Sequence, residues 1–81
     1  MKTYNINLNL IEDVKAFASD INKEIKSKVL IKNDMYVLNA KSLLGILSLD
    51  LSEPIEVSIL SEDINELKRF KEIIRKYEVC I

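Results

Sequence analysis

The sequence predicts an α+β domain in which three helices cover one face of a four-stranded antiparallel sheet. The spacing of the apolar residues carries this prediction, because it switches several times between the two-residue period of a strand and the longer period of a helix. The single glycine (Gly45) and the single proline (Pro54) leave no linker that would divide the 81 residues. We therefore expect one domain over residues 1–81, with its elements in the order β-α-β-β-α-β-α.

A strand and a helix are expected at the start of the chain. Apolar side chains alternate with asparagines from Tyr4 to Leu10, as in a strand with one buried face. From Glu12 the apolar period becomes helical, and Glu12 and Asp13 place carboxylates at the positive end of the helix dipole. The buried stripe of this helix is expected to contain Val14, Phe17, Ala18, Ile21 and Ile25.

A hairpin and a short helix are expected next. Val29 to Lys32 and Met35 to Ala40 are short β-type runs on either side of the Asn33–Asp34 pair, which tolerates left-handed turn geometry. Ser42 then fits the N-cap of a short helix from Leu43 to about Leu49, where such a cap contributes about 1 kcal/mol.

The remaining residues predict a strand and a helix. Pro54 opens a strand from Ile55 to Leu60 whose alternate residues share one apolar face. Ser61 is expected to cap the last helix, with Glu62 and Asp63 in its first turn. The buried stripe of this helix is expected to contain Ile64, Leu67, Phe70, Ile74 and Tyr77.

Composition argues against several classes of function. Lysine and arginine number 12 against 13 acidic residues, so general attraction to nucleic acid or to an anionic membrane is not expected. The chain has no stretch of 18 apolar residues and no apolar leader segment, which favours a soluble protein of the cytoplasm.

Enzymatic and metal sites are not expected either. The lone Cys80 has no ligand near it in the sequence and is interpreted as a small hydrophobic residue near the C-terminus. The adjacent carboxylates Glu12–Asp13 and Glu62–Asp63 fall at predicted helix starts, where dipole compensation explains them. We therefore expect a protein that is not an enzyme and that uses no metal or other cofactor.

The segment Asn39–Leu49 carries a family resemblance. Its Lys41–Ser42 pair leads into two leucines and then Gly45, and this pattern resembles the regulatory-serine segment of HPr, the histidine-containing phosphocarrier of the bacterial sugar phosphotransferase system. The element order and the length are similar to those of HPr, and Pro54–Ile59 fits its fourth strand. The resemblance implies the HPr-like open-faced β-sandwich, in which three helices cover one face of the sheet.

The resemblance fails at the phosphate-carrying site. HPr proteins carry phosphate on a histidine just before the first helix, in a His-x-Arg-Pro sequence. The family spacing from Ser42 places Ile11 at the histidine position and Asp13 at the arginine position. Because the 81 residues contain no histidine, we expect no phosphohistidine transfer. Glu12 and Asp13 would also repel a phosphate at this helix end.

Ser42 has two interpretations that the sequence leaves open. As a helix cap, the serine needs no further role. As the counterpart of the HPr serine, it would be phosphorylated by a dedicated kinase, and the phosphate would lie beside Lys41 at a helix N-terminus.

The leucines that follow Ser42 are candidates for partner binding. Only part of a short helix can face the sheet, and we expect that part to be Ile46 with Leu49 or Leu51. An exposed apolar cluster marks an interaction surface, as the matching positions do in HPr. The alternative is that the leucines pack under a loop or in a homodimer. The candidate partner-binding residues are Lys41, Leu43, Leu44 and Leu47.

These observations predict a regulatory protein-binding module, similar to the catabolite-repression HPr-like proteins that lack the histidine and keep the serine. Its expected partners are proteins, namely an HPr-type serine kinase or a transcriptional regulator. The alternative is a purely structural subunit or a homodimeric HPr-derived domain in which Ser42 is only a helix cap.

Overall fold

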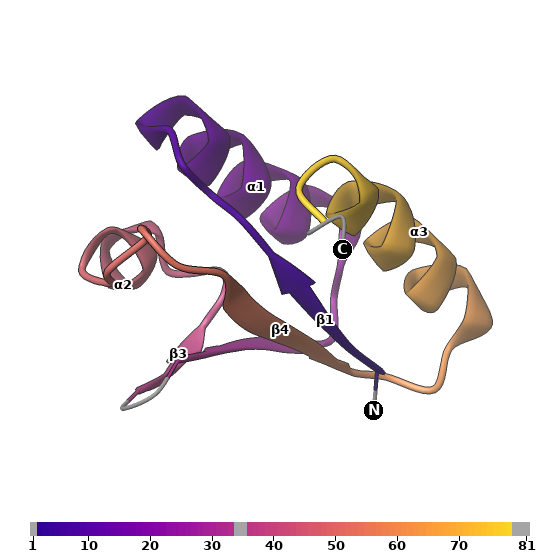
Figure 1. The fold of residues 1–81 in the computed structure, drawn as a ribbon. Helices are drawn as coiled ribbons and strands as arrows, with labels where there is room; N and C mark the ends of the chain where they lie inside the picture. The colour runs from indigo at the N-terminus through magenta and orange to yellow at the C-terminus, as the bar shows by residue number, and fades with distance from the viewer. Residues whose placement is uncertain (1, 34–35, 79–81) are drawn as a thin grey trace.

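The computed structural model describes residues 2–33 and 36–78, and within them the predicted fold class and element order are confirmed. Three helices lie on one side of a four-stranded sheet (Figure 1). The elements are β1 (Lys2–Ile6), α1 (Ile11–Glu24), β2 (Lys28–Lys32), β3 (Val37–Asn39), α2 (Leu43–Leu47), β4 (Ile55–Leu60) and α3 (Ile64–Arg75).

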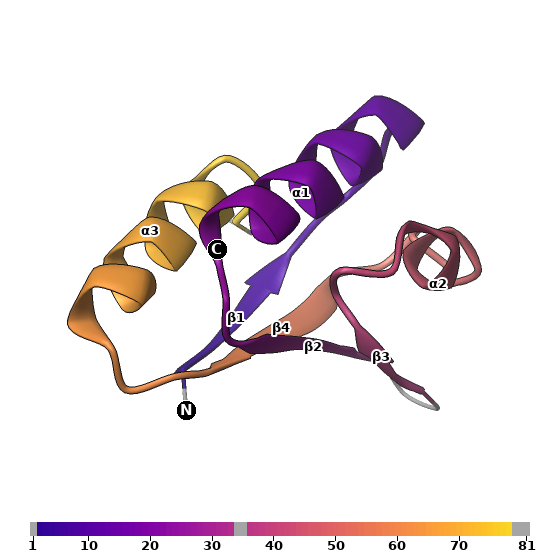
Figure 2. The ribbon, with the colours of Figure 1, turned by 180° about the vertical axis from the view of Figure 1, so that it is seen from behind.

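The sheet has the strand order β1-β4-β2-β3, and every pair is antiparallel. In the register, Tyr4 lies opposite Val57 and Ile31 opposite both Val57 and Leu38. The last strand in the chain is therefore an inner strand that joins the first strand to the β2–β3 hairpin. Helices α1 and α3 pack side by side over the sheet, and the short α2 lies at the end of the molecule away from α3, where it contacts α1 and β3 (Figures 1 and 2).

The core fills the space between the sheet and the helices. Along β2 and β4, buried residues alternate with more exposed ones, as expected for strands that bury one face. Tyr77 packs edge-on against Phe17, and Tyr4 packs against Phe70. The largest fully buried side chains are Phe17, Phe70, Ile6, Leu8, Ile21, Ile25, Ile31, Ile46, Ile55, Ile59, Ile74 and Val14.

The first strand is shorter than its alternating pattern predicts. Pairing with β4 stops at Ile6, and Leu8 is still buried, but Leu10 is 58% exposed. The prediction that Leu10 continues the buried face is wrong, because Leu10 is the N-cap residue of α1. The helix begins at Ile11, and its predicted buried stripe and acidic first turn are confirmed.

The last helix begins later than predicted. Its N-cap is Asp63, whose carboxylate accepts a hydrogen bond of 2.9 Å from the Asn65 amide. Ser61 instead accepts a hydrogen bond from the Asp63 amide, so the predicted Ser61 cap is wrong. Ile64 is 68% exposed as the first residue of the helix, which corrects its place in the buried stripe.

A buried carboxylate links α3 to the connection between α1 and β2. Glu66 is only 4% exposed, and it accepts hydrogen bonds from the Lys26 amide (2.6 Å), the Ser27 amide (3.3 Å) and the Ser27 hydroxyl. The Ser27 hydroxyl and then the Lys26 amide hold the pKa of Glu66 below its usual value. Three donors thus compensate the burial of one charge.

The chain beyond α3 returns to β1. The Asn7 amide donates a 2.8 Å hydrogen bond to the Tyr77 carbonyl, and Ile6 forms an isolated antiparallel bridge with Glu78. At the other edge, the Asn33 side chain accepts a hydrogen bond from the Tyr36 amide, and the β2–β3 pairing confirms the predicted hairpin. The predicted turn residue Asp34, the strand residue Met35 and the terminal Cys80 lie outside the described residues.

None of the helices in the described part of the chain has the length and apolar content that crossing a membrane requires.

Candidate functional site

Helix α2 is capped by the serine that the sequence singles out. Ser42 has an extended backbone conformation, and its Oγ accepts a 3.2 Å hydrogen bond from the Gly45 amide. The predicted N-cap is therefore confirmed, and the exposed hydroxyl remains open to solvent. The helix ends at Leu47 rather than near Leu49, and the Ser48 hydroxyl donates a hydrogen bond to the Gly45 carbonyl.

The leucines of α2 divide between the core and the surface. Ile46 is fully buried and Leu49 is 9% exposed, as expected for the face toward the sheet. Leu44 is 80% exposed and Leu47 is 40% exposed. Leu43 is half-buried and packs against the core, so the expectation that all three outer leucines are exposed holds only for Leu44 and Leu47.

Lys41 anchors α2 to the end of α1. Its Nζ donates a 3.3 Å hydrogen bond to the Lys26 carbonyl, and its own carbonyl accepts a 3.1 Å bond from the Asn22 side-chain amide. The ammonium therefore contacts the chain that leaves α1, where a cation suits the negative end of the helix dipole. The structure gives Lys41 a positioning contact that the sequence does not predict.

The start of α1 adds two apolar side chains at the same end of the molecule as α2 (Figures 1 and 2). Ile11 is 64% exposed, and Leu10 before it is 58% exposed. Asn22 lies eleven residues after Ile11, about three helical turns, so both side chains project from the same flank of α1. Because Asn22 contacts Lys41, that flank is the one that faces α2.

The neighbouring acidic residues lie on other sides of α1. Glu12 is exposed to solvent. Asp13 lies toward Tyr77 on the opposite flank from Ile11, as does Asp20. Burial, followed by the negative charges of Asp20 and Asp13, raises the pKa of the Tyr77 phenol.

We call Leu10, Ile11, Leu44 and Leu47 the apolar end surface. They are four of the eight large apolar side chains that are exposed among the described residues. The other four are divided between the β2–β3 hairpin and the junction of β4 with α3. Leu10 with Ile11 and Leu44 with Leu47 are two exposed apolar pairs on elements at the same end of the molecule, and we take them as the candidate site because exposed apolar side chains mark an interaction surface. The sequence analysis assigned Leu10 to a strand and considered Ile11 only as the residue at the HPr histidine position. Two adjacent apolar residues just before the acidic first turn of a helix could have indicated their exposure.

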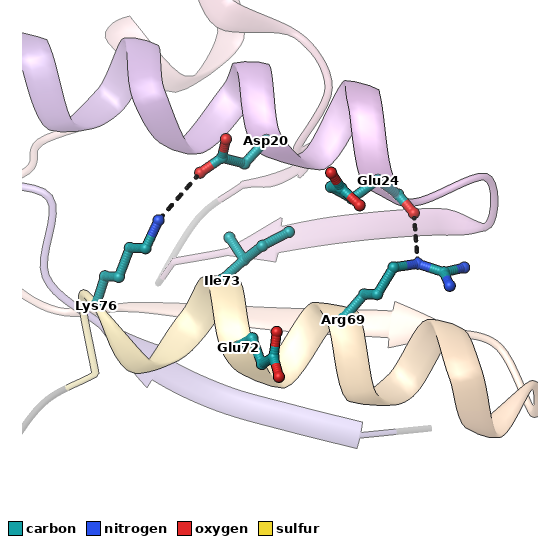
Figure 3. Close-up of a pocket in the computed structure, with 6 residues that line it drawn as sticks. All are labelled: Asp20, Glu24, Arg69, Glu72, Ile73 and Lys76. Carbon is teal, nitrogen blue, oxygen red and sulfur yellow. Dashed lines mark hydrogen bonds and ion pairs between the residues drawn. The ribbon is translucent and has the colours of Figure 1, made fainter.

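A groove of about 260 Å³ between α1 and α3 is another candidate (Figure 3). Arg69 Nε donates a 3.1 Å hydrogen bond to the Glu24 carbonyl, and Lys76 Nζ lies 3.8 Å from an Asp20 carboxylate oxygen. These contacts join the two helices across the groove. In the described ranges, no group of three or more acidic, histidine or cysteine side chains could hold a metal ion. The Arg69–Glu24 and Lys76–Asp20 contacts make the groove part of the packing between α1 and α3.

Comparison with known proteins gives a structural match alone. No protein-family model and no curated protein matches the chain. A crystal structure of a phosphocarrier protein HPr from Bacillus anthracis str. Ames matches with a TM-score of 0.73 at 20% sequence identity, over 95% of this chain and 94% of that one. The chain has the HPr fold. The crystal structure of HPr-C-His from Thermoanaerobacter tengcongensis matches with a TM-score of 0.70 at 23% identity, over 94% of this chain and 93% of that one.

Proposed function

We propose that this chain is an HPr-like regulatory module of the cytoplasm that binds a protein partner and does not carry phosphohistidine. The observation that carries the proposal is the exposure of Leu44 and Leu47 on a helix capped by Ser42. Leaving a leucine such as Leu44 four-fifths exposed has a hydration cost that partner binding would remove.

The residues at the position of the HPr histidine support the proposal that this chain does not carry phosphohistidine. The 81 residues contain no histidine. The HPr spacing places Ile11, which offers no nucleophile, at the position of the histidine. Glu12 and Asp13 follow in the first turn of α1, where their charges oppose a phosphate. Incubation with phosphoenolpyruvate and the first enzyme of the phosphotransferase system is expected to leave no acid-labile phosphate on the protein.

The partner classes that fit are an HPr-type serine kinase and a transcriptional regulator. An exposed Ser42 hydroxyl at the start of α2 supports phosphorylation, because a kinase can reach it without unfolding the domain. The added dianion would lie one turn or less from Leu44, at the edge of the apolar end surface. Phosphorylation would thereby change the partner's affinity.

Substitution of Leu47 tests the proposal. Leu47→Asp is expected to lower affinity for the partner by at least about tenfold, since it places a charge on an exposed apolar part of α2. Leu60→Asp is the matched control, because Leu60 is 42% exposed at the far end of β4. Isothermal titration against the candidate kinase and regulator measures both variants. Equal binding by wild type and Leu47→Asp would contradict the proposal.

A structural or homodimeric role is the second candidate, and the Ser42 cap bond favours it, since that bond alone accounts for a serine at this position. Sedimentation equilibrium distinguishes the two. A dimer that Leu44→Asp dissociates, with no effect of kinase, would favour this candidate over the partner-binding one.

A further inference from the structure

We infer that two copies of this chain associate through the free edge of strand β3, as an antiparallel strand pair centred on Val37. The inference goes beyond the proposed function and uses a different surface from the apolar end surface. It concerns the β2–β3 hairpin, which forms one edge of the sheet (Figures 1 and 2).

The two edges of the sheet differ in how they are protected. The edge strand β1 begins with Lys2, and the chain beyond α3 covers its other end, where Ile6 forms a bridge with Glu78. Within the described residues, the edge strand β3 (Val37–Asn39) has β2 as its one neighbour, and it contains neither a charged residue nor a proline. Charged residues, proline and covering chain are the usual means by which an edge strand avoids pairing. The β3 edge is therefore the one that is open to another strand.

Val37 directs its backbone groups toward this open edge. On one side of it, the Tyr36 carbonyl accepts a 3.0 Å hydrogen bond from the Asn33 amide. On the other side, the Ala40 amide donates a 2.8 Å hydrogen bond to the Val29 carbonyl. Backbone groups of successive residues point to opposite sides of an antiparallel strand, so those of Val37 face away from β2. The Val37 side chain is also 61% exposed.

The register of the pair follows from the backbone groups that remain. Asn39 also faces the open edge, but its carbonyl already accepts a 3.0 Å hydrogen bond from the Ser42 amide. Centring the pair on Val37 lets this residue exchange both backbone hydrogen bonds with Val37 of the second copy. The same register places Tyr36, which is 57% exposed, opposite the half-buried Leu38 of the second copy. Both exposed apolar side chains of the hairpin then form cross-strand pairs.

This self-complementarity favours a second copy as the occupant of the edge. Lys32 lies beside Val37 on the open face of the sheet, and the two Lys32 residues of a dimer would be three strand spacings apart, about 14 Å. Salt at physiological concentration screens charges at that distance. On the helix side, Asp50 and Glu53 line a hollow with Tyr36, and raised salt would screen these carboxylates too.

The inferred dimer joins two sheets into one. Because the two-fold axis of an antiparallel pair is perpendicular to the sheet, the four strands of each copy form a continuous sheet with all helices on the same face. Each copy contributes a strand of three residues, so the contact is small. We expect a weak dimer with a dissociation constant between about 10 μM and 1 mM.

Sedimentation equilibrium measures the association. The wild-type chain at up to about 1 mM, in about 0.5 M salt, is expected to reach the mass of a dimer. Val37→Lys is expected to weaken the association by at least about tenfold, because a lysine on an edge strand opposes pairing. Leu60→Lys is the matched control and is expected to have no effect, since Leu60 is 42% exposed on the inner strand β4.

Disulfide formation tests the register. In a Cys80→Ser background, Val37→Cys is expected to give a covalent dimer on oxidation in air, because the Cα atoms of a hydrogen-bonded pair lie about 5.5 Å apart. Asn39→Cys is the control at a second exposed position of the same edge. The inferred register offsets Asn39 from its counterpart by four residues, about 14 Å, so this variant is expected to remain monomeric.

Three results would overturn the inference. The first is a chain that remains monomeric at about 1 mM, whether or not an added strand-forming peptide binds its edge. The second is a dimer that Leu44→Asp dissociates and Val37→Lys does not, or one that Leu60→Lys weakens as much as Val37→Lys. The third is equal disulfide formation at positions 37 and 39. Circular dichroism and thermal unfolding of each variant show that it is folded.

Discussion

The side-chain amide of Asn22, near the end of α1, donates a hydrogen bond to the backbone carbonyl of Lys41, which lies 19 residues later and just before the N-cap of α2. The same Nδ2 atom also donates to the Ala18 carbonyl one turn earlier, so both of its hydrogens have an acceptor. This contact fixes where the chain enters α2.

Asn22→Ala is therefore expected to lower the free energy of unfolding by about 1 kcal/mol, because it removes both hydrogen bonds. It should also speed amide hydrogen exchange in α2 more than in α3. Urea denaturation and exchange measured by NMR give the two quantities. Asn65→Ala, an exposed change of the same type in the first turn of α3, serves as the control. A similar effect of both variants on α2 exchange would refute the anchoring role.

Glu66 gives the fold a dependence on acid. Its folded-state pKa is lowered, so its carboxylate stabilises the folded state above the ordinary value of 4.5, and this stabilisation is lost as the pH falls through the folded-state pKa. Glu66→Gln is expected to lower the free energy of unfolding at pH 7 by about 1–3 kcal/mol, because it weakens charge-assisted hydrogen bonds to Lys26 and Ser27.

The difference between wild type and Glu66→Gln should shrink as the pH is lowered below about 4.5. Denaturation at a series of pH values measures this difference, and Glu72→Gln, at an exposed position of the same helix, is the control. A difference that stays constant with pH would show that the ionised carboxylate is not responsible.

Gly45 and Ser42 are expected to be energetically coupled. A Cβ on residue 45 would lie 3.1 Å from the Ser42 Oγ and 3.4 Å from its Cβ, so Gly45→Ala gains helix propensity of about 1 kcal/mol but crowds the cap. We expect little net change in wild type and a clear gain in the Ser42→Gly background. A double-mutant cycle by urea denaturation should give a coupling of about 0.5–1 kcal/mol. Additive effects would mean that the cap moves aside without cost.

Phosphorylation is expected at Ser42 alone. Treatment with an HPr-type serine kinase and ATP should add the mass of one phosphate group, and Ser42→Ala should abolish this gain. Ser48→Ala is the control, because Ser48 is also exposed and lies at the other end of α2. A gain that survives Ser42→Ala would place the modification elsewhere, and no gain in wild type would favour Ser42 as a cap only.

The sequence predicted most of the fold because its information was periodic and local. The buried stripe from Val14 to Ile21 follows from the helical period, and the alternation along β4 follows from the two-residue period of a strand. The Ser42 cap depends on Gly45, three positions away. Errors fell where elements meet. Ser61 and Asp63 are both competent caps two residues apart, and that shift left Ile64 in the first turn, facing solvent.

The features of the fold and of the candidate site that escaped prediction depend on contacts between residues far apart in the sequence. Glu66 is 40 residues from Lys26, and nothing in the helical pattern of α3 distinguishes a buried glutamate from an exposed one. Lys41 was assigned to a partner surface, and its bond to Lys26 becomes visible only once α1 and α2 are placed. Leu43, predicted to be exposed, is half-buried because so short a helix lies close to the core.

The position of β4 in the sheet has a consequence for synthesis of the chain. Both of its neighbours, β1 and β2, leave the ribosome before it, and neither can pair with it until residues 55–60 emerge. Until then the β2–β3 hairpin is the largest piece of sheet that can form, and the apolar faces of β1 and α1 have no sheet to cover. A nascent chain arrested before Pro54 should therefore be recognised by chaperones, whereas release of residues 55–75, which form β4 and α3, lets the domain close in one cooperative step.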